Sequence, residues 1–266
     1  MAMILAITNQ KGGVGKTTTA VNLAASLAAT QRKVLLLDLD PQGNATTGSG
    51  VNKYELQQSL YEVLTRKCGI QDAIVACPDA GYDLLPANAD LTAAEVELIN
   101  VIGREQRLRR ALAEVADRYD YILIDCPPSL SMLTVNAMVA SEAVFIPMQC
   151  EYFALEGLSA LMETVESIRE AYNPDLYIEG LVRTMYDRRS SLTNEVSAQL
   201  TAHFGDKLYE TVIPRNIRLA EAPSHGVPAL VYDRTSRGAL AYLALAGEMN
   251  RRHHSRRGAD KVREQV

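Results

Sequence analysis

A glycine-rich segment near the start of the sequence could bind phosphate. It reads Lys11-Gly12-Gly13-Val14-Gly15-Lys16-Thr17-Thr18 and follows a short apolar run. Glycines let backbone N–H groups turn toward phosphate oxygens, and a helix that begins near Lys16 would direct its positive end at the same anion. The pattern predicts that Lys16 reaches the β- and γ-phosphates of a nucleotide, that the Thr17 hydroxyl is a ligand of Mg²⁺ and that Thr18 contacts the α-phosphate.

Two other segments end an apolar run with carboxylates. Residues 34–37 lead into Asp38 and Asp40, and residues 121–124 lead into Asp125, which a Pro-Pro pair follows closely. Ligands bind at the carboxyl ends of the strands of a parallel sheet, so these side chains are expected near the phosphates. Asp125 fits a residue that holds the Mg²⁺ shell. Asp38 or Asp40 could instead cap a turn.

Strand and helix patterns alternate along the chain and would bring these groups to one edge of a sheet. Together they predict a three-layer α/β fold, in which a mostly parallel twisted sheet has helices on both faces. We expect one P-loop ATPase domain over residues 1–250 and a basic, frayed tail over residues 251–266. The expected strands are residues 3–8, 34–38, 82–86, 121–125, 143–147, 178–182 and 208–213, and the expected helices are residues 17–29, 104–116, 153–171, 192–204 and 237–249.

Composition restricts the class of protein. The 266 residues are 47% hydrophobic and 22% charged, which suits one domain with a sizeable core. The four cysteines have no C-x-x-C spacing and are interpreted as reduced thiols rather than metal ligands. The first apolar run stops at Thr8 and has no basic segment before it, so we expect a cytoplasmic protein.

The net charge of −5 conceals an asymmetry. From Arg183 to the end there are 14 basic and 9 acidic residues, whereas the first 182 residues hold 13 basic and 23 acidic ones. A basic final third on an acidic body allows a local nucleic-acid patch, although the whole-chain charge would argue against one.

The glycine-rich segment departs from the usual phosphate loop. Gln10 stands where the first glycine is expected and Lys11 follows it, which gives the deviant Walker A pattern K-G-G-x-G-K-[ST]. In this the chain resembles the ParA/MinD family of P-loop ATPases. The resemblance implies that Lys11 reaches across a sandwich dimer to the partner's ATP, that Asp40 orients the attacking water and that Asp38 lies near Mg²⁺. The alternative is that Lys11 is a solvated lysine beside a loop.

Two later segments narrow the resemblance to the chromosomal ParA (Soj) subgroup, and it extends from Met3 to about Asn250. Residues 149–157 contain Glu151, which the resemblance places near the ATP ribose or the partner subunit, although an acidic residue at a helix start explains it equally well. Residues 213–226 contain Pro214 and Arg215, which are expected to form the adenine pocket with Met185.

Proteins of this subgroup segregate chromosomes, which implies a set of partners. The ATP-bound homodimer would bind double-stranded DNA without sequence preference, and a ParB-type protein would stimulate hydrolysis. Arg189 and Arg218 correspond to DNA-contacting positions, so we expect a nucleoid-associated protein that contacts phosphates through them. These arginines could instead be solvated or paired with acidic neighbours.

Four other classes of function are alternatives to chromosome segregation. A MinD-like ATPase would act on a membrane, but residues 250–258 lack a large apolar face, so no stable membrane insertion is expected. A positioning ATPase for protein clusters or plasmids is a serious alternative. An iron–sulfur carrier would need other cysteine spacing, and a synthetase that phosphorylates a carboxylate would need a small-molecule pocket.

Overall fold

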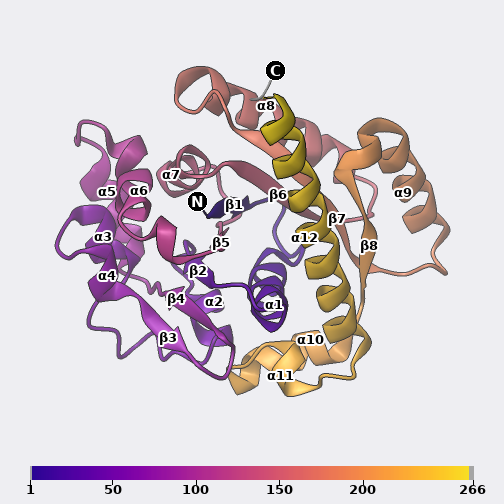
Figure 1. Ribbon diagram of the computed structural model, residues 1–266, viewed down its shortest axis with the longest axis horizontal. Helices are drawn as coiled ribbons and strands as arrows, with labels where there is room; N and C mark the ends of the chain where they lie inside the picture. The colour runs from indigo at the N-terminus through magenta and orange to yellow at the C-terminus, as the bar shows by residue number, and fades with distance from the viewer. Residues whose placement is uncertain (1, 264–266) are drawn as a thin grey trace.

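All the strands in the described part of the chain join one sheet (Figure 1). The computed structural model describes residues 2–263, with side chains described as far as Arg256. Eight strands lie in the order β3-β4-β2-β5-β1-β6-β7-β8, and every neighbouring pair is parallel except β3 with β4. The strands are β1 (Met3–Ile7), β2 (Val34–Asp38), β3 (Val75–Cys77), β4 (Tyr82–Leu85), β5 (Tyr121–Asp125), β6 (Ala143–Gln149), β7 (Tyr177–Tyr186) and β8 (Leu208–Pro214).

Helices cover both faces of this sheet, which confirms the predicted three-layer fold. One core cluster joins the sheet to α1, α11 and α12, and two further clusters join it to α3, α5, α6, α7, α8 and α9. The helices are α1 (Lys16–Ala29), α2 (Asn44–Gly48), α3 (Leu60–Thr65), α4 (Ile70–Ala73), α5 (Leu91–Leu98), α6 (Arg107–Ala113), α7 (Met132–Ala140), α8 (Ala154–Ala171), α9 (Ser191–Phe204), α10 (Ile217–Glu221), α11 (Ala229–Tyr232) and α12 (Arg237–Arg263).

The central strand β1 explains where the phosphate loop lies. Successive side chains of a strand point to opposite faces, and Leu5 and Ile7 pack with α1 whereas Ala6 packs on the other face. The neighbours of β1 are β5 on one side and β6 on the other. The chain leaves β1 toward β2 on the β5 side and later crosses to β6. The loop after β1 is therefore at a switch point, where such sheets bind ligands.

The predicted helix over residues 104–116 is shorter in the structure. A 3₁₀ turn (Arg104–Gln106) precedes α6, and a second one (Ala116–Arg118) follows it. Gly103 enters the segment in a left-handed conformation, with φ of +69°, and the Asn136 side chain of α7 accepts a hydrogen bond from the Leu108 N–H. These local contacts set the start of α6 at Arg107.

Helix α12 continues well past Met249, where the sequence predicted that the helix would give way to a frayed tail. Buried Tyr242, Leu245 and Ala246 pack its first half into the core. Its second half is held by two arginines. Arg252 pairs with Glu248 at 2.8 Å and lies over the Tyr209 ring, and Arg256 pairs with buried Glu179 and lies over the Tyr177 ring. Residues 264–266 of the predicted tail lie outside the described range, and the flexibility of the tail stays a prediction.

Candidate nucleotide-binding site

The phosphate loop joins β1 to α1 and leaves the start of α1 open to an anion. Gly13 and Gly15 have φ of +75° and +84°, values that favour glycine. Gly15 directly precedes α1, and neither a side-chain cap nor an acidic residue occupies the first turn of this helix. Side chains placed on Gly12 or Gly13 would meet no atom within 4 Å. The loop therefore presents uncapped N–H groups beside open space, as a phosphate site requires.

Two hydrogen bonds fix the shape of the loop. The Lys16 ammonium donates to the carbonyl oxygen of Lys11 at 3.0 Å, and the Thr184 hydroxyl at the end of β7 donates to the carbonyl oxygen of Val14 at 2.8 Å. Lys16 is only 7% exposed. Burial lowers its pKa, and the negative charge of Asp125 opposes this effect. A phosphate bound in the loop would compensate a charge that the protein has largely removed from water.

Lys11 points away from the loop that contains it. Its ammonium forms an ion pair with the Glu151 carboxylate of the same chain, with 2.6 Å between Nζ and Oε2. The Lys11 and Glu151 side chains are 37% and 50% exposed. The backbone N–H of Lys11 donates to Asn9 Oδ1 at 3.0 Å, so the main chain is held while the charged end stays at the surface.

The end of β5 offers a carboxylate that fits a metal ion. Asp125 is fully buried, and neither of its oxygens has a hydrogen-bond partner among the described residues. Burial and the charge of Asp38 raise the pKa of Asp125 well above its usual range, and the neighbouring Thr17 hydroxyl opposes this. Buried carboxylates without partners are unfavourable. Carboxylate and hydroxyl oxygens suit Mg²⁺, so Thr17 and Asp125 are the residues that would hold it.

Asp38 and Asp40 organise the loop after β2. One Asp38 oxygen accepts hydrogen bonds from the Thr46 N–H and hydroxyl, both at 2.7 Å, and the other accepts from the Asp40 N–H at 3.2 Å. Burial raises the pKa of Asp38 to about 6. Asp40 lies at the surface of the turn and accepts from the Gln42 N–H at 2.9 Å. Asp38 therefore holds the loop internally, whereas half-buried Asp40 holds the turn that follows it.

A cavity of about 290 Å³ opens beside the loop, between β7, β8 and α12. It brings together Met185, Pro214 and Arg215, which the sequence predicted for the adenine pocket, and it includes Gly15 and Thr18 of the phosphate loop. A base in this cavity would lie next to the phosphates. Thr184, Ile213, Asn216, Leu219, Ala220 and Tyr242 complete its wall.

Tyr242 was not foreseen as a site residue. It lies in α12, more than 220 residues from the phosphate loop, and its hydroxyl is 3.0 Å from the Thr19 hydroxyl of α1. Its position in the sequence fits the buried face of a helix, and no local motif marks it. The one signal that could have predicted its contact is chemical: a buried tyrosine hydroxyl needs a polar partner.

The two arginines predicted to contact DNA lie outside this cavity and are paired with acids. Arg189 forms an ion pair with Asp187 at 2.9 Å, although 90% of its side chain is exposed. Its hydrogen bonds lower the pKa of Asp187 to about 2. Arg218 in α10 pairs with Glu221 at 2.8 Å and with Asp233 at 3.3 Å. Both charges are available at the surface, but each already has an acidic neighbour.

None of the four cysteines is in a disulfide. Cys68, Cys77, Cys126 and Cys150 are free, and the last three of them are buried. Burial raises the pKa of Cys77 and Cys150 to about 11, so these thiols are protonated at neutral pH. Within the described residues no group of three or more His, Cys, Asp or Glu side chains is arranged to hold a metal ion by itself. None of the described helices is both long and apolar enough to cross a membrane.

A phosphate loop at the switch point of a parallel sheet, with buried carboxylates at two neighbouring strand ends, defines a P-loop nucleotide-binding protein. Comparison with known proteins identifies the family within this class. A family model described as an AAA domain matches residues 2–178. The sporulation initiation inhibitor protein Soj of Bacillus subtilis is 54% identical over 249 residues, which are 94% of this chain and 98% of that protein. The chromosome partitioning protein ParA of Caulobacter vibrioides is 53% identical, covering 95% and 96%.

A solved structure agrees in fold. The structure described as cobyrinic acid a,c-diamide synthase from Mycobacterium smegmatis, with bound ATP analogue and magnesium, has a TM-score of 0.82 and 37% identity. It covers 96% of this chain and 97% of its own. The chain therefore belongs to the ParA/Soj family of P-loop ATPases.

Proposed function

We propose that this protein is a chromosome-partitioning ATPase whose ATP-bound homodimer binds double-stranded DNA without sequence preference. The observation that carries the proposal is Lys11, a second lysine at the surface of a phosphate loop that already contains Lys16. One subunit does not need both to hold a nucleotide. A lysine at the mouth of the loop suits contact with a second subunit, as the resemblance of the loop to the ParA/MinD pattern implies.

In this proposal each residue of the site has a separate role in ATP hydrolysis. The loop N–H groups and Lys16 bind the phosphates, and the cavity at Met185, Pro214 and Arg215 takes the adenine. Thr17 and Asp125, with Asp38 beside them, would hold Mg²⁺, which would supply positive charge to the phosphates. Asp40 orients the attacking water, and Lys11 of the other subunit offsets the charge that builds up during transfer. Glu151 would then lie at the boundary of the two subunits.

Arg189 and Arg218 are the residues proposed to contact DNA. Contacts to phosphates require positive charge but no geometry that recognises bases, so they carry no sequence preference. Their ion pairs with Asp187, Glu221 and Asp233 would have to exchange for phosphate contacts. Exposed ion pairs of this kind are weak, so the exchange is energetically accessible. Association with the nucleoid and stimulation of hydrolysis by a ParB-type partner follow from the same proposal.

The test is binding to a non-specific DNA duplex with ATP, with ADP and without nucleotide, across a salt series. We expect binding only with ATP, weakening as salt rises, because counterions are released from the phosphates. Arg189→Glu should abolish it, and a Lys33→Glu variant should not. If no nucleotide state binds DNA, the DNA proposal fails, although the nucleotide site would stand.

The synthase name of the Mycobacterium smegmatis structure supports a second candidate. A P-loop protein can also transfer the γ-phosphate of ATP to a carboxylate. Ammonia, free or released from an amide donor, then attacks the acyl carbon of the acyl phosphate and expels inorganic phosphate, which leaves an amide. The relatives at 53–54% identity are named for partitioning, and this chain is only 37% identical to the synthase. ATP turnover that requires cobyrinic acid and a nitrogen donor, and that DNA leaves unchanged, would favour the synthase.

A further inference from the structure

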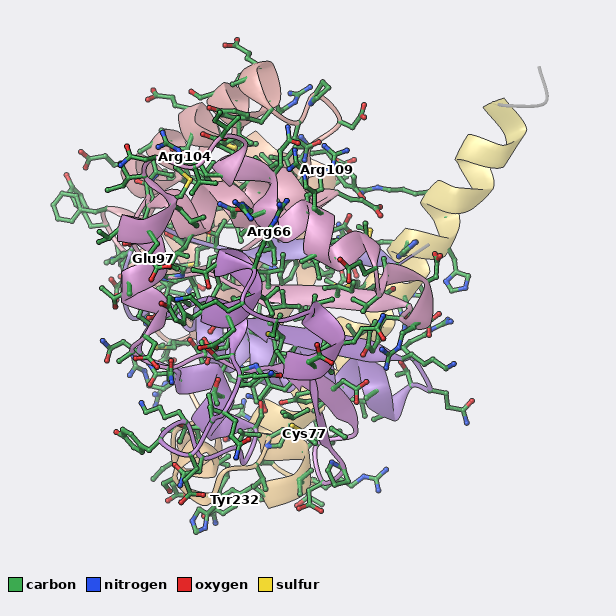
Figure 2. The ribbon with its side chains drawn as sticks, turned by 90° about the vertical axis from the view of Figure 1, so that its left-hand side faces the viewer. Arg66, Cys77, Glu97, Arg104, Arg109 and Tyr232 are labelled. Atoms are coloured by element: carbon green, nitrogen blue, oxygen red, sulfur yellow. The ribbon has the colours of Figure 1, made fainter. Side chains whose placement is uncertain are left out.

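A group of arginines stands on helices that contribute nothing to the nucleotide site. Arg66 ends α3 in a left-handed conformation, with φ of +61°, and Arg107 and Arg110 lie one turn apart on α6. Helices α3 and α6 pack against each other on the same face of the sheet. Figure 2 shows Arg66, Arg104 and Arg109 on the side of the molecule turned toward the viewer. We call Arg66, Arg107 and Arg110 the arginine cluster.

The arginine cluster has no internal counter-charge. Among residues with described side chains, none of its members forms an ion pair. Arg110 donates only to the neutral Gln106 side chain, at 3.2 Å. Arg107 is half-buried. Its Nε and Nη1 atoms are shielded from solvent, and neither has a hydrogen-bond partner among the residues with described side chains.

Two basic neighbours are compensated. Arg104 pairs with Glu105 at 3.1 Å, and Lys67 pairs with Glu97 at 3.3 Å. The three arginines of the cluster differ from these two neighbours in having no acidic partner among the residues with described side chains. Burial and then repulsion from Arg66 and Arg110 lower the pKa of Arg107, which indicates that the three charges act on one another. Charges that repel within the folded chain favour an anion from outside.

The spacing of the cluster fits an extended anion better than a small one. Arg107 and Arg110 lie three residues apart on α6, which is roughly 5 Å along the helix axis, and Arg66 stands on the adjoining helix α3. Phosphates follow each other along one DNA strand at about 3.4 Å of axial rise. Arg110 and Arg66 can therefore contact neighbouring phosphates, and the half-buried Arg107 between them adds positive charge.

We propose that the arginine cluster is a second contact surface for the phosphate backbone of double-stranded DNA. The inference rests on the proposed function, since it assumes that the protein binds DNA. It adds a surface separate from Arg189 and Arg218. Helices α3 and α6 lie toward the β4 end of the sheet, whereas Arg189 precedes α9 at the β8 end, on the other side of the molecule (Figure 1).

The experiment compares DNA affinity across a salt series, with ATP, for the full chain and its variants. The main variant is Arg66→Glu with Arg110→Glu, which leaves half-buried Arg107 in place. We expect its salt dependence, the slope of log K against log salt, to fall by about two, because each phosphate contact contributes roughly 0.9. The neutral pair Arg66→Gln with Arg110→Gln should lose slope in the same direction, which separates lost contacts from added repulsion.

Arg109→Glu is the matched control. Arg109 is exposed on the same helix but lines a different hollow, with Ser141 and Asp175, so its slope should match the wild type. Basal ATP hydrolysis and thermal unfolding should be the same for all variants. An unchanged slope in the double variants, with binding still abolished by Arg189→Glu, would overturn the second surface and leave the proposed function intact.

A wild-type protein that binds no DNA would overturn both proposals. If the double variants instead lost binding to phosphatidylserine vesicles while their DNA slope stayed unchanged, the cluster would belong to a lipid surface and the proposal would be wrong. An equal loss in the Arg109→Glu control would show a general charge effect and would also remove the assignment.

Discussion

Lys11 and Glu151 form an ion pair within one chain, with 2.6 Å between ammonium and carboxylate. The lysine proposed to act on the ATP of a second subunit is thus held by its own subunit. Lys11 cannot keep this contact and also reach across a dimer. Formation of the dimer must therefore exchange one partner of Lys11 for another.

Replacing Glu151 by Gln should release Lys11 and favour the dimer. An exposed ion pair contributes roughly 0.2–1 kcal/mol. A dimer exchanges two such pairs, one from each subunit, so we expect dimerisation in ATP to strengthen by up to about 30-fold. Analytical ultracentrifugation with a non-hydrolysed ATP analogue measures this, and Glu156→Gln, in the first turn of α8, is the control. A loss of ATP affinity in the monomer would instead identify Glu151 as a nucleotide ligand.

Lys16→Ala should remove nucleotide binding. The buried ammonium is expected to make two charge-assisted hydrogen bonds to phosphates, each contributing about 1.5–3 kcal/mol. The affinity for ATP should then fall at least about 100-fold, as measured by titration calorimetry. Lys33→Ala, an exposed lysine away from the loop, should bind normally. Tight ATP binding by Lys16→Ala would contradict the assignment of the phosphate loop.

Asp40→Ala should separate binding from hydrolysis. Asp40 is proposed to orient water and not to hold the nucleotide, so the variant should bind ATP, dimerise and remain on DNA while phosphate release falls about 100-fold or more. Phosphate release and size-exclusion chromatography in ATP measure the two properties. Normal turnover in this variant would remove Asp40 from the mechanism.

Arg256→Ala should destabilise the protein, because among residues with described side chains it leaves the buried Glu179 carboxylate with only the Tyr209 hydroxyl as a partner, at 2.9 Å. Loss of one member of a buried pair destabilises by about 3–5 kcal/mol and loss of an exposed pair by less than about 1. Arg256 is 43% exposed, so we expect a decrease of about 1–3 kcal/mol in urea denaturation. Arg251→Ala, on the exposed side of the same helix, should change little.

The Asp187–Arg189 pair gives a prediction for pH. Arg189 holds the pKa of Asp187 at about 2, below the unfolded value of about 3.9. The contribution of this pair to stability is therefore present above pH 4 and is lost as the pH falls toward 2. Carboxyl ¹³C shifts of Asp187 measure the pKa, which should rise toward 3.9 in Arg189→Gln. A wild-type value near 3.9 would show that the pair does not form in solution.

The sequence predicted seven of the eight strands because buried parallel strands are continuous apolar runs. It missed β3 (Val75–Cys77), since three residues carry too little pattern to distinguish a strand from a turn. It placed the phosphate loop and the strand-end aspartates correctly at one edge of the sheet. The resemblance supplied Met185, Pro214 and Arg215, which the structure gathers around one cavity.

The features that the sequence did not predict depend on contacts between residues that are far apart in the chain. The Arg-rich end of α12 has the composition of a loose tail, and nothing near it shows that Glu179 in β7 requires a cation. The same is true of Tyr242, whose role depends on Thr19. The partner of Lys11 is 140 residues away, in a segment that could equally have favoured a helix start.

Tyr242 makes α12 the last wall of the proposed adenine cavity to be synthesised. Its partner Thr19, directly after the phosphate loop, is made 223 residues earlier. A nascent chain therefore contains the phosphate-loop sequence long before it can form the pocket for the base. Since a ligand stabilises only the state that binds it, ATP would stabilise the finished chain and leave unfinished or truncated chains to cellular proteases.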